Sequence, residues 1–119
     1  MTRLKNVVSK GWGQENIWAT NDNYCGKFLH FEKGSKCSLH FHAVKDETWY
    51  VLTGKFIVNY IDAANGDELS TVLTPGMTWH NPPLVPHQLV CDTAGTIIEV
   101  STADSVEDNY RIRPGDSQT

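Results

Sequence analysis

Short runs rich in apolar residues, separated by turn residues roughly every ten positions, make up the chain from Tyr24 onward. This pattern is typical of an all-β sandwich or barrel, in which each strand buries one of its two faces. No segment of ten or more residues keeps a helical period over its full length. We therefore expect an all-β fold, with strands near residues 15–19, 24–32, 37–42, 47–53, 55–61, 69–74, 77–81, 86–91 and 95–102.

Glycine, proline and asparagine mark the turns between these strands. The strongest hairpin signal is Asn65-Gly66, because both residues readily adopt the positive φ angles of a tight two-residue turn. The other turn positions are Gly34, Gly54, Pro75-Gly76, Pro82-Pro83 and Gly95.

The two ends of the chain lack a strong period. We interpret residues 1–9 as an N-terminal arm with an edge strand through Val7 and Val8. Residues 105–119 form a polar C-terminal tail that either wraps a sheet edge or frays. Because 119 residues suit one hydrophobic core and are too few for two, we expect a single domain over residues 1–119.

Three side chains of the kind that bind metals lie within eight positions: His40, His42 and Glu47. Strand side chains alternate between faces, so His40 and His42 point the same way while Phe41 points the other. The polar break at residues 43–46 lets the chain reverse. Glu47 then opens an antiparallel neighbour and can bring its carboxylate beside the two rings.

A fourth candidate ligand, His87, follows the proline-rich run at residues 82–86, which suits a rigid entry to a strand. Three imidazoles and one carboxylate suit Mn, Fe, Co, Ni, Cu or Zn and leave one or two coordination positions open. We therefore expect one divalent transition metal ion held by His40, His42, Glu47 and His87. Its identity stays open, because affinity order and cellular availability decide which metal occupies such a site.

The spacing of these residues resembles the first signature of the cupins, with Gly34, His40, His42, Glu47 and Gly54 in register. Gly76, Pro82 and His87 match the second cupin signature. Leu84 stands where that signature usually has glycine, and Cys91 where it has asparagine. Neither is a ligand position, so these departures bear on the local turn. The resemblance implies a single cupin domain, a jelly-roll barrel also described as a double-stranded β-helix.

A narrower resemblance, over about residues 10 to 116, is to the cupin domain of type II mannose-6-phosphate isomerases. It rests on residues 10–13, Tyr24, Lys27, Ser38-Leu39, 47–54, 97–101, Glu107-Asp108 and Arg111. It implies a sugar-phosphate isomerase, and the family implies a homodimer.

Composition narrows the possible partners. The chain is 39% hydrophobic and 20% charged, and its 14 acidic and 10 basic residues give a net charge of −4. A mildly acidic chain is a poor candidate for non-specific nucleic-acid binding. The apolar runs are too short for a membrane span, and the first residues lack the apolar core of a signal peptide. We expect a cytoplasmic protein that binds neither nucleic acid nor membrane.

The three cysteines, Cys25, Cys37 and Cys91, form no C-x-x-C pair and are expected to be reduced. In an unbroken strand, Cys37 would face away from His40 and His42. We therefore do not count it as a ligand.

Three further residues are candidates for the pocket. Trp49 shares the face of Glu47 and is either a pocket wall or core filling. Glu99 interrupts the apolar run at residues 96–101 and faces either solvent or the interior, where burial would raise its pKa toward that of a general base. The family resemblance favours the interior. His80 is a weaker candidate for the pocket, on the strand that leads to the prolines.

Aldose–ketose isomerisation moves a proton between adjacent carbons while charge gathers on the oxygens of an enediolate. A divalent metal can polarise those oxygens, and Glu99 is the base that we nominate. Lys27 and Arg111 match family positions and carry the charge to hold a phosphate or the reacting oxygens, unless they are solvated surface charges. The substrate would be a small molecule such as a sugar phosphate.

Three function classes stay open at this stage. The first is a sugar-phosphate isomerase or a related sugar-modifying enzyme. The second is an Fe(II)-dependent dioxygenase, which predicts a mostly apolar cavity without a phosphate site. The third is a non-catalytic module that binds a sugar or a metal, which predicts a folded, metal-bearing protein without turnover. Fold alone does not decide among them.

Overall fold

The structure, a computed structural model, describes residues 6–119. These residues form nine strands and one short 3₁₀-helix: β1 (Asn6–Lys10), β2 (Gly13–Thr20), β3 (Tyr24–Phe31), β4 (Leu39–Phe41), β5 (Glu47–Ile61), β6 (Glu68–Leu73), β7 (Thr78–Asn81), β8 (His87–Thr102), β9 (Tyr110–Arg113) and η1 (Asp116–Gln118). The all-β prediction is confirmed. In this part of the chain, no helix is long and apolar enough to cross a membrane.

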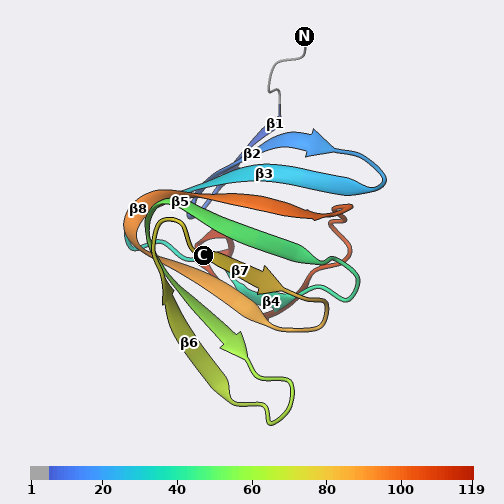
Figure 1. Ribbon diagram of the computed structural model, residues 1–119, viewed down its shortest axis with the longest axis vertical. Coiled ribbons are helices and arrows are strands. Elements are labelled where there is room, and N and C mark those ends of the chain that lie inside the picture. The colour runs from blue at the N-terminus through green and yellow to red at the C-terminus, as the bar shows by residue number, and fades with distance from the viewer. Residues whose placement is uncertain (1–5) are drawn as a thin grey trace.

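The strands form one antiparallel sheet that curls around an interior (Figure 1). One path through the sheet runs β1-β2-β3-β8-β4-β9, while β5 pairs with β6, β7 and β8. The two longest strands, β5 and β8, bend as they cross the molecule and pair with each other along most of their length. The β5–β6 hairpin turns through residues 62–67, which include the predicted Asn65-Gly66. The loop is longer than the expected two-residue turn, and of the two residues only Gly66 has a positive φ, at 77°.

The strands predicted at 47–53 and 55–61 are one bent strand, β5, and those at 86–91 and 95–102 are one bent strand, β8. The residues expected to end these strands bend them instead. Gly54 has φ +84°, and a Cβ at this position would lie 2.7 Å from the Cα of Gly95. The β5–β8 register shifts at this point, so the two glycines form a bulged crossing that lets the sheet curl.

The core lies inside this curl and is built largely from aromatic and branched side chains. Trp12 stacks on Phe31 with ring centroids 4.2 Å apart, and Phe56 meets Phe31 edge-on at 5.4 Å. On β5 the predicted alternation is confirmed, because Trp49 is buried while Tyr50 is exposed. Trp49 therefore belongs to the core and is also available to a site inside the barrel.

The two chain ends behave differently from each other. Of the arm predicted over residues 1–9, residues 1–5 lie outside the described part, and Asn6–Lys10 form the edge strand β1 that includes Val7 and Val8. The C-terminal tail wraps a sheet edge, since β9 pairs with β4. This pairing brings residues from the end of the chain next to the histidines of β4.

The turn before β8 has leucine at position 84, where the second cupin signature usually has glycine. Leu84 has φ 71°, a left-handed conformation that costs an ordinary residue about 1–2 kcal/mol. Its N–H donates to the carbonyl oxygen of His42 at 2.7 Å. The proline-rich turn is thereby tied to the segment that carries the histidine pair.

Candidate metal centre

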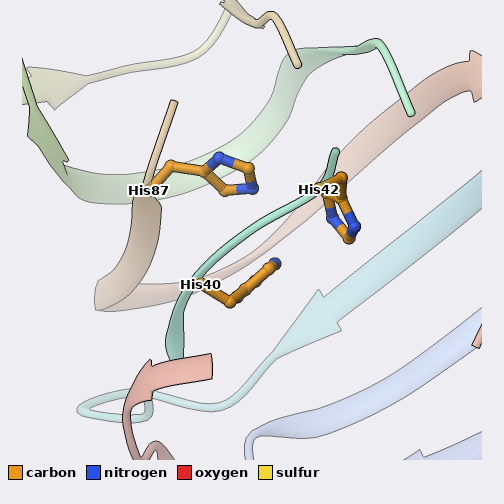
Figure 2. Close-up of side chains that lie close together, drawn as sticks. All are labelled: His40, His42 and His87. Atoms are coloured by element: carbon orange, nitrogen blue, oxygen red, sulfur yellow. The ribbon is translucent and has the colours of Figure 1, made fainter. Parts of the chain in front are cut away.

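His40, His42 and His87 converge on one point inside the barrel (Figure 2). One ring nitrogen from each of them lies within 4.8 Å of those of the other two. His40 on β4 pairs directly with His87 on β8, and His42 follows two residues after His40. The fold therefore brings these three histidines together, as the sequence predicted.

Each of the three rings is oriented by a backbone carbonyl, which accepts from its Nδ1. The acceptors are Ser38 for His40 at 2.9 Å, Asp108 for His42 at 2.5 Å and Val85 for His87 at 2.9 Å. A carbonyl oxygen can only accept, so Nδ1 carries the proton in each ring and Nε2 keeps its lone pair. This second contact is the usual way in which proteins orient a histidine toward a metal ion.

Two of the imidazoles are also held in the neutral form that a metal ligand requires. Burial, together with the nearby His87, lowers the pKa of His40 to about 3. Burial also lowers the pKa of His42, against the opposing effect of its hydrogen bond to Asp108. Both rings are therefore uncharged near pH 7.

The contact between His87 and Glu47 tests whether these residues fit a metal ion. The Nε2 of His87 is buried and has no hydrogen-bond partner among the described residues, yet it lies 2.9 Å from Oε1 of Glu47. Burial alone would raise the pKa of Glu47, but the nearby charge of Lys45 opposes this effect, and the pKa lies well below its ordinary value. A nitrogen lone pair thus faces a carboxylate oxygen, an arrangement that a divalent cation bound to both would satisfy.

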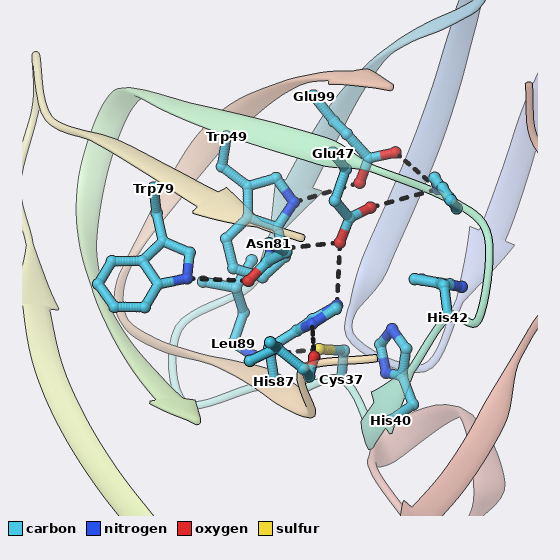
Figure 3. A network of polar contacts seen from close by, with 12 residues as sticks. Cys37, His40, His42, Glu47, Trp49, Trp79, Asn81, His87, Leu89 and Glu99 are labelled. Atoms are coloured by element: carbon cyan, nitrogen blue, oxygen red, sulfur yellow. Dashed lines mark hydrogen bonds and ion pairs between the residues drawn. The ribbon is translucent and has the colours of Figure 1, made fainter. Parts of the chain in front are cut away.

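Glu47 is oriented by a chain of donors that the sequence did not indicate (Figure 3). Trp79 Nε1 donates to Asn81 Oδ1 at 2.8 Å, and Asn81 Nδ2 donates to Glu47 Oε1 at 3.2 Å. Lys45 Nζ lies 3.3 Å from the other carboxylate oxygen. Lys45 comes from the polar break that we treated only as a turn, so no periodic pattern marked it.

Glu99 faces the interior, as the family resemblance favoured, and is 5% exposed. On β8 it pairs with Lys27 of β3 on one side and Trp49 of β5 on the other. Trp49 Nε1 donates to Oε1 at 3.2 Å and Lys45 Nζ donates to Oε2 at 3.1 Å. Burial and the charge of Glu47 raise the pKa of Glu99 to about 7, against the opposing pull of Lys45 and Lys27.

A cavity of about 260 Å³ joins these groups. Its wall includes His40, His42, Glu47, Trp49 and Glu99, as well as several apolar core side chains. Lys27 and Arg111, predicted to hold the substrate, both line it. Arg111 is exposed, whereas Lys27 is buried among carboxylates.

Two predictions about orientation are wrong. His80 does not line the cavity: its side chain is 58% exposed and bonds Asp46 at 2.6 Å, because β7 turns its neighbour Asn81 inward instead. Cys37 does line the cavity, since β4 begins only at Leu39 and strand alternation does not reach back to it. Burial raises the pKa of the Cys37 thiol to about 12, so it stays protonated and makes a poor ligand.

Comparison with known proteins gives one family and one fold. Residues 27–101 match the cupin domain model. An RmlC-like cupin from Shewanella frigidimarina is 26% identical, with a TM-score of 0.70 over 90% of this chain and 88% of that one. KdgF from Halomonas sp. is 22% identical, with a TM-score of 0.66 over 79% of this chain and 81% of that one.

A variant of oxalate decarboxylase from Bacillus subtilis is 19% identical, with a TM-score of 0.78 over 92% of this chain. The present chain spans only 30% of that protein. No curated protein matches. These likenesses confirm the predicted fold class, an all-β jelly-roll barrel.

Proposed function

This chain belongs to the cupin domain family, and we propose that it is a metal-dependent enzyme that isomerises a small sugar phosphate between its aldose and ketose forms. The observation that carries the proposal is the arrangement of His40, His42 and His87. Their Nδ1 atoms are bound to backbone carbonyls, so their Nε2 lone pairs are free to converge on one ion. His40 and His42 line a cavity whose wall also includes a buried carboxylate, Glu99.

The three histidines and Glu47 would hold one divalent ion. Among the proteins with this fold, Bacillus subtilis oxalate decarboxylase has Mn(II) centres, which supports a divalent metal without identifying it here. When bound, such an ion would act as a Lewis acid toward substrate oxygens. Lys45 and Asn81 would keep the Glu47 carboxylate ionised and correctly turned.

Glu99 is the residue that we assign to proton transfer. Its side chain faces the cavity, and Trp49 and Lys45 each hold one of its two oxygens. A proton can be taken from one substrate carbon and returned to the next only by a group that stays in place, and these two contacts supply that fixed position. The indole ring of Trp49 also packs into the apolar core, which excludes water from one side of the carboxylate.

The lining of the cavity favours this activity over the dioxygenase alternative. A dioxygenase cavity was expected to be mostly apolar and without a phosphate site. Here the wall is strongly polar: it carries four cationic side chains, Lys10, Lys27, Lys45 and Arg111, and four carboxylates, Glu15, Glu47, Glu99 and Asp104. Lys27 and Lys45 are paired with these carboxylates, and Lys10 and Arg111 offer charge to an anionic substrate. A hexose phosphate combines hydroxyl groups for the metal with an anionic group for these cations.

The test combines elemental analysis of the purified protein with a turnover assay. Mannose 6-phosphate and fructose 6-phosphate would be supplied after reloading with each of Mn, Fe, Co, Ni, Cu and Zn. We expect stoichiometric metal and interconversion of the two sugars with at least one metal, and no turnover by the His42→Ala variant. Stoichiometric metal without turnover would exclude the isomerase and favour a non-catalytic module.

A further inference from the structure

Two lysine ammonium groups are buried in the cavity wall. Lys27 on β3 and Lys45 in the turn after β4 are each 5% exposed. A buried ammonium is stable only when charged or polar partners replace its water. Four carboxylates do so here: Lys27 contacts Glu15, Glu99 and Asp104, and Lys45 contacts Glu47, Glu99 and Asp104.

Asp104 differs from the other three carboxylates in position. Glu15, Glu47 and Glu99 lie on strands, and their side chains are no more than 15% exposed. Asp104 follows the end of β8, and its side chain is 34% exposed. Val106, two residues further on, is 97% exposed, so little burial holds this segment in place.

Asp104 bridges the two lysines as a bound anion would. Its Oδ2 lies 2.7 Å from Lys27 Nζ, and its Oδ1 lies 3.2 Å from Lys45 Nζ. One oxyanion group thus gives one oxygen to each ammonium group. Phosphate and free carboxylates can make the same pair of contacts, because each offers two or more oxygens on one central atom.

The opening of the cavity is suited to the entry of an anion. Lys10 and Arg111 are exposed and line the cavity, and neither has an ion pair with another residue in the range 6–119. Cations at the mouth of a low-dielectric cleft attract anionic ligands toward it. An anion that followed them inward would reach the lysines that Asp104 bridges.

We propose that Lys27 and Lys45 form the site for the oxyanion group of the substrate, a phosphate or a carboxylate, and that Asp104 occupies this site in the free protein and leaves it when substrate binds. The inference depends on the proposed function in one respect: it takes the ligand of this site to be the substrate of the enzyme. Exchange of one oxyanion for another keeps both lysines paired, so displacement does not leave a buried charge without a partner.

Calorimetric titration with inorganic phosphate tests the competition. The Asp104→Asn variant removes the internal competitor, so we expect it to bind phosphate at least about 10-fold more tightly than the unaltered protein. Asp92→Asn is the matched control, because Asp92 is an exposed aspartate whose ion pair with Lys55 lies on the surface. This control should leave the phosphate Kd unchanged, and Lys27→Met in the Asp104→Asn background should abolish the gain.

Hydrogen exchange supplies a readout on the unaltered protein. Saturating phosphate should speed amide exchange in residues 103–107, because that segment loses its contact with the lysines. A parallel titration with acetate distinguishes the two oxyanions: tighter phosphate binding assigns a phosphorylated substrate, and tighter acetate binding assigns a carboxylated one.

The inference is overturned if Asp104→Asn binds neither anion more tightly than Asp92→Asn does, or if the gain survives Lys27→Met. If the variants fail to fold, unchanged exchange in residues 103–107 at saturating phosphate overturns it instead. Anion binding needs no turnover. A protein that binds phosphate through these lysines but does not isomerise hexose phosphates would therefore keep this site and lose the proposed activity.

Discussion

The imidazole of His42 donates its Nδ1 proton to the carbonyl oxygen of Asp108 at 2.5 Å, across 66 residues of sequence. The carboxylate of the same aspartate accepts the backbone N–H groups of Ala43, Val44 and Lys45, at 2.7, 3.2 and 2.9 Å. Asp108 thus orients one candidate metal ligand and also holds the turn that carries the buried Lys45. The C-terminal segment is therefore part of the site.

Replacing Asp108 with alanine should loosen the turn that follows His42 and, with it, the orientation of the ring. We expect metal affinity to fall by about 10- to 100-fold, the usual effect of losing a group that positions a ligand. Lost hydrogen bonds to a charged group should lower the free energy of unfolding by about 1–2 kcal/mol. Metal titration and denaturant unfolding measure the two effects. Asp92→Ala is the control, and equal metal affinity in the two variants would contradict the role of Asp108.

His42→Ala should remove the metal and leave the fold largely intact, because the apolar core lies in other residues. The matched control is His80→Ala, which removes an exposed histidine outside the cavity. Elemental analysis should show metal lost from the first variant and retained by the second, with similar circular dichroism. Full metal stoichiometry in His42→Ala would show that the ligand assignment is wrong.

Glu99→Gln should abolish proton transfer without removing the metal. Glutamine keeps the shape of the side chain but cannot accept a proton, so we expect turnover of hexose phosphate to fall by about 100-fold or more. Metal content should be unchanged, since Glu99 lies outside the group of histidines. Glu32→Gln, at an exposed position, is the control for loss of charge. Retained turnover in Glu99→Gln would assign proton transfer to another residue.

Leu84→Gly should stabilise the protein. Leucine is strained at φ 71°, and its side chain is 63% exposed, so little packing is lost on removing it. Relief of about 1–2 kcal/mol of strain, less the added entropy of glycine in the unfolded chain, leaves a gain of about 0.5–1 kcal/mol. Leu84→Ala keeps the Cβ and should bring no comparable gain. Denaturant midpoints of the three proteins measure this, and a midpoint lowered by glycine would refute the prediction.

The strand pattern could be predicted from the sequence because side-chain alternation and turn formation depend on residues that are close together in the chain. Alternation on β5 correctly put Trp49 on the same buried face as Glu47, and the spacing of His40 and His42 correctly placed both rings together. The errors came where local rules stop applying. Gly54 and Gly95 bend strands that we expected them to end, because the two backbones meet there across the sheet.

The positions of His80 and Cys37 show the same limit. Parity along a strand says which residues share a face, but not which face points inward or where the strand begins. Asn81 turned inward in place of His80, and β4 began after Cys37. Both outcomes depend on how β7 and β4 pair with distant strands.

The sequence by itself determined the strand rhythm, the candidate metal-binding residues and the resemblance to cupins, since these follow from residue type and spacing. Only the tertiary structure decided that Glu99 lies between Lys27 and Trp49, that Lys45 turns inward, and that the segment after β8 brings Asp104 and Asp108 to the site. The physical reason is that these contacts depend on the register in which the strands pair. Contacts between strands far apart in the chain are selected by the packing of the whole sheet, which no short stretch of residues encodes.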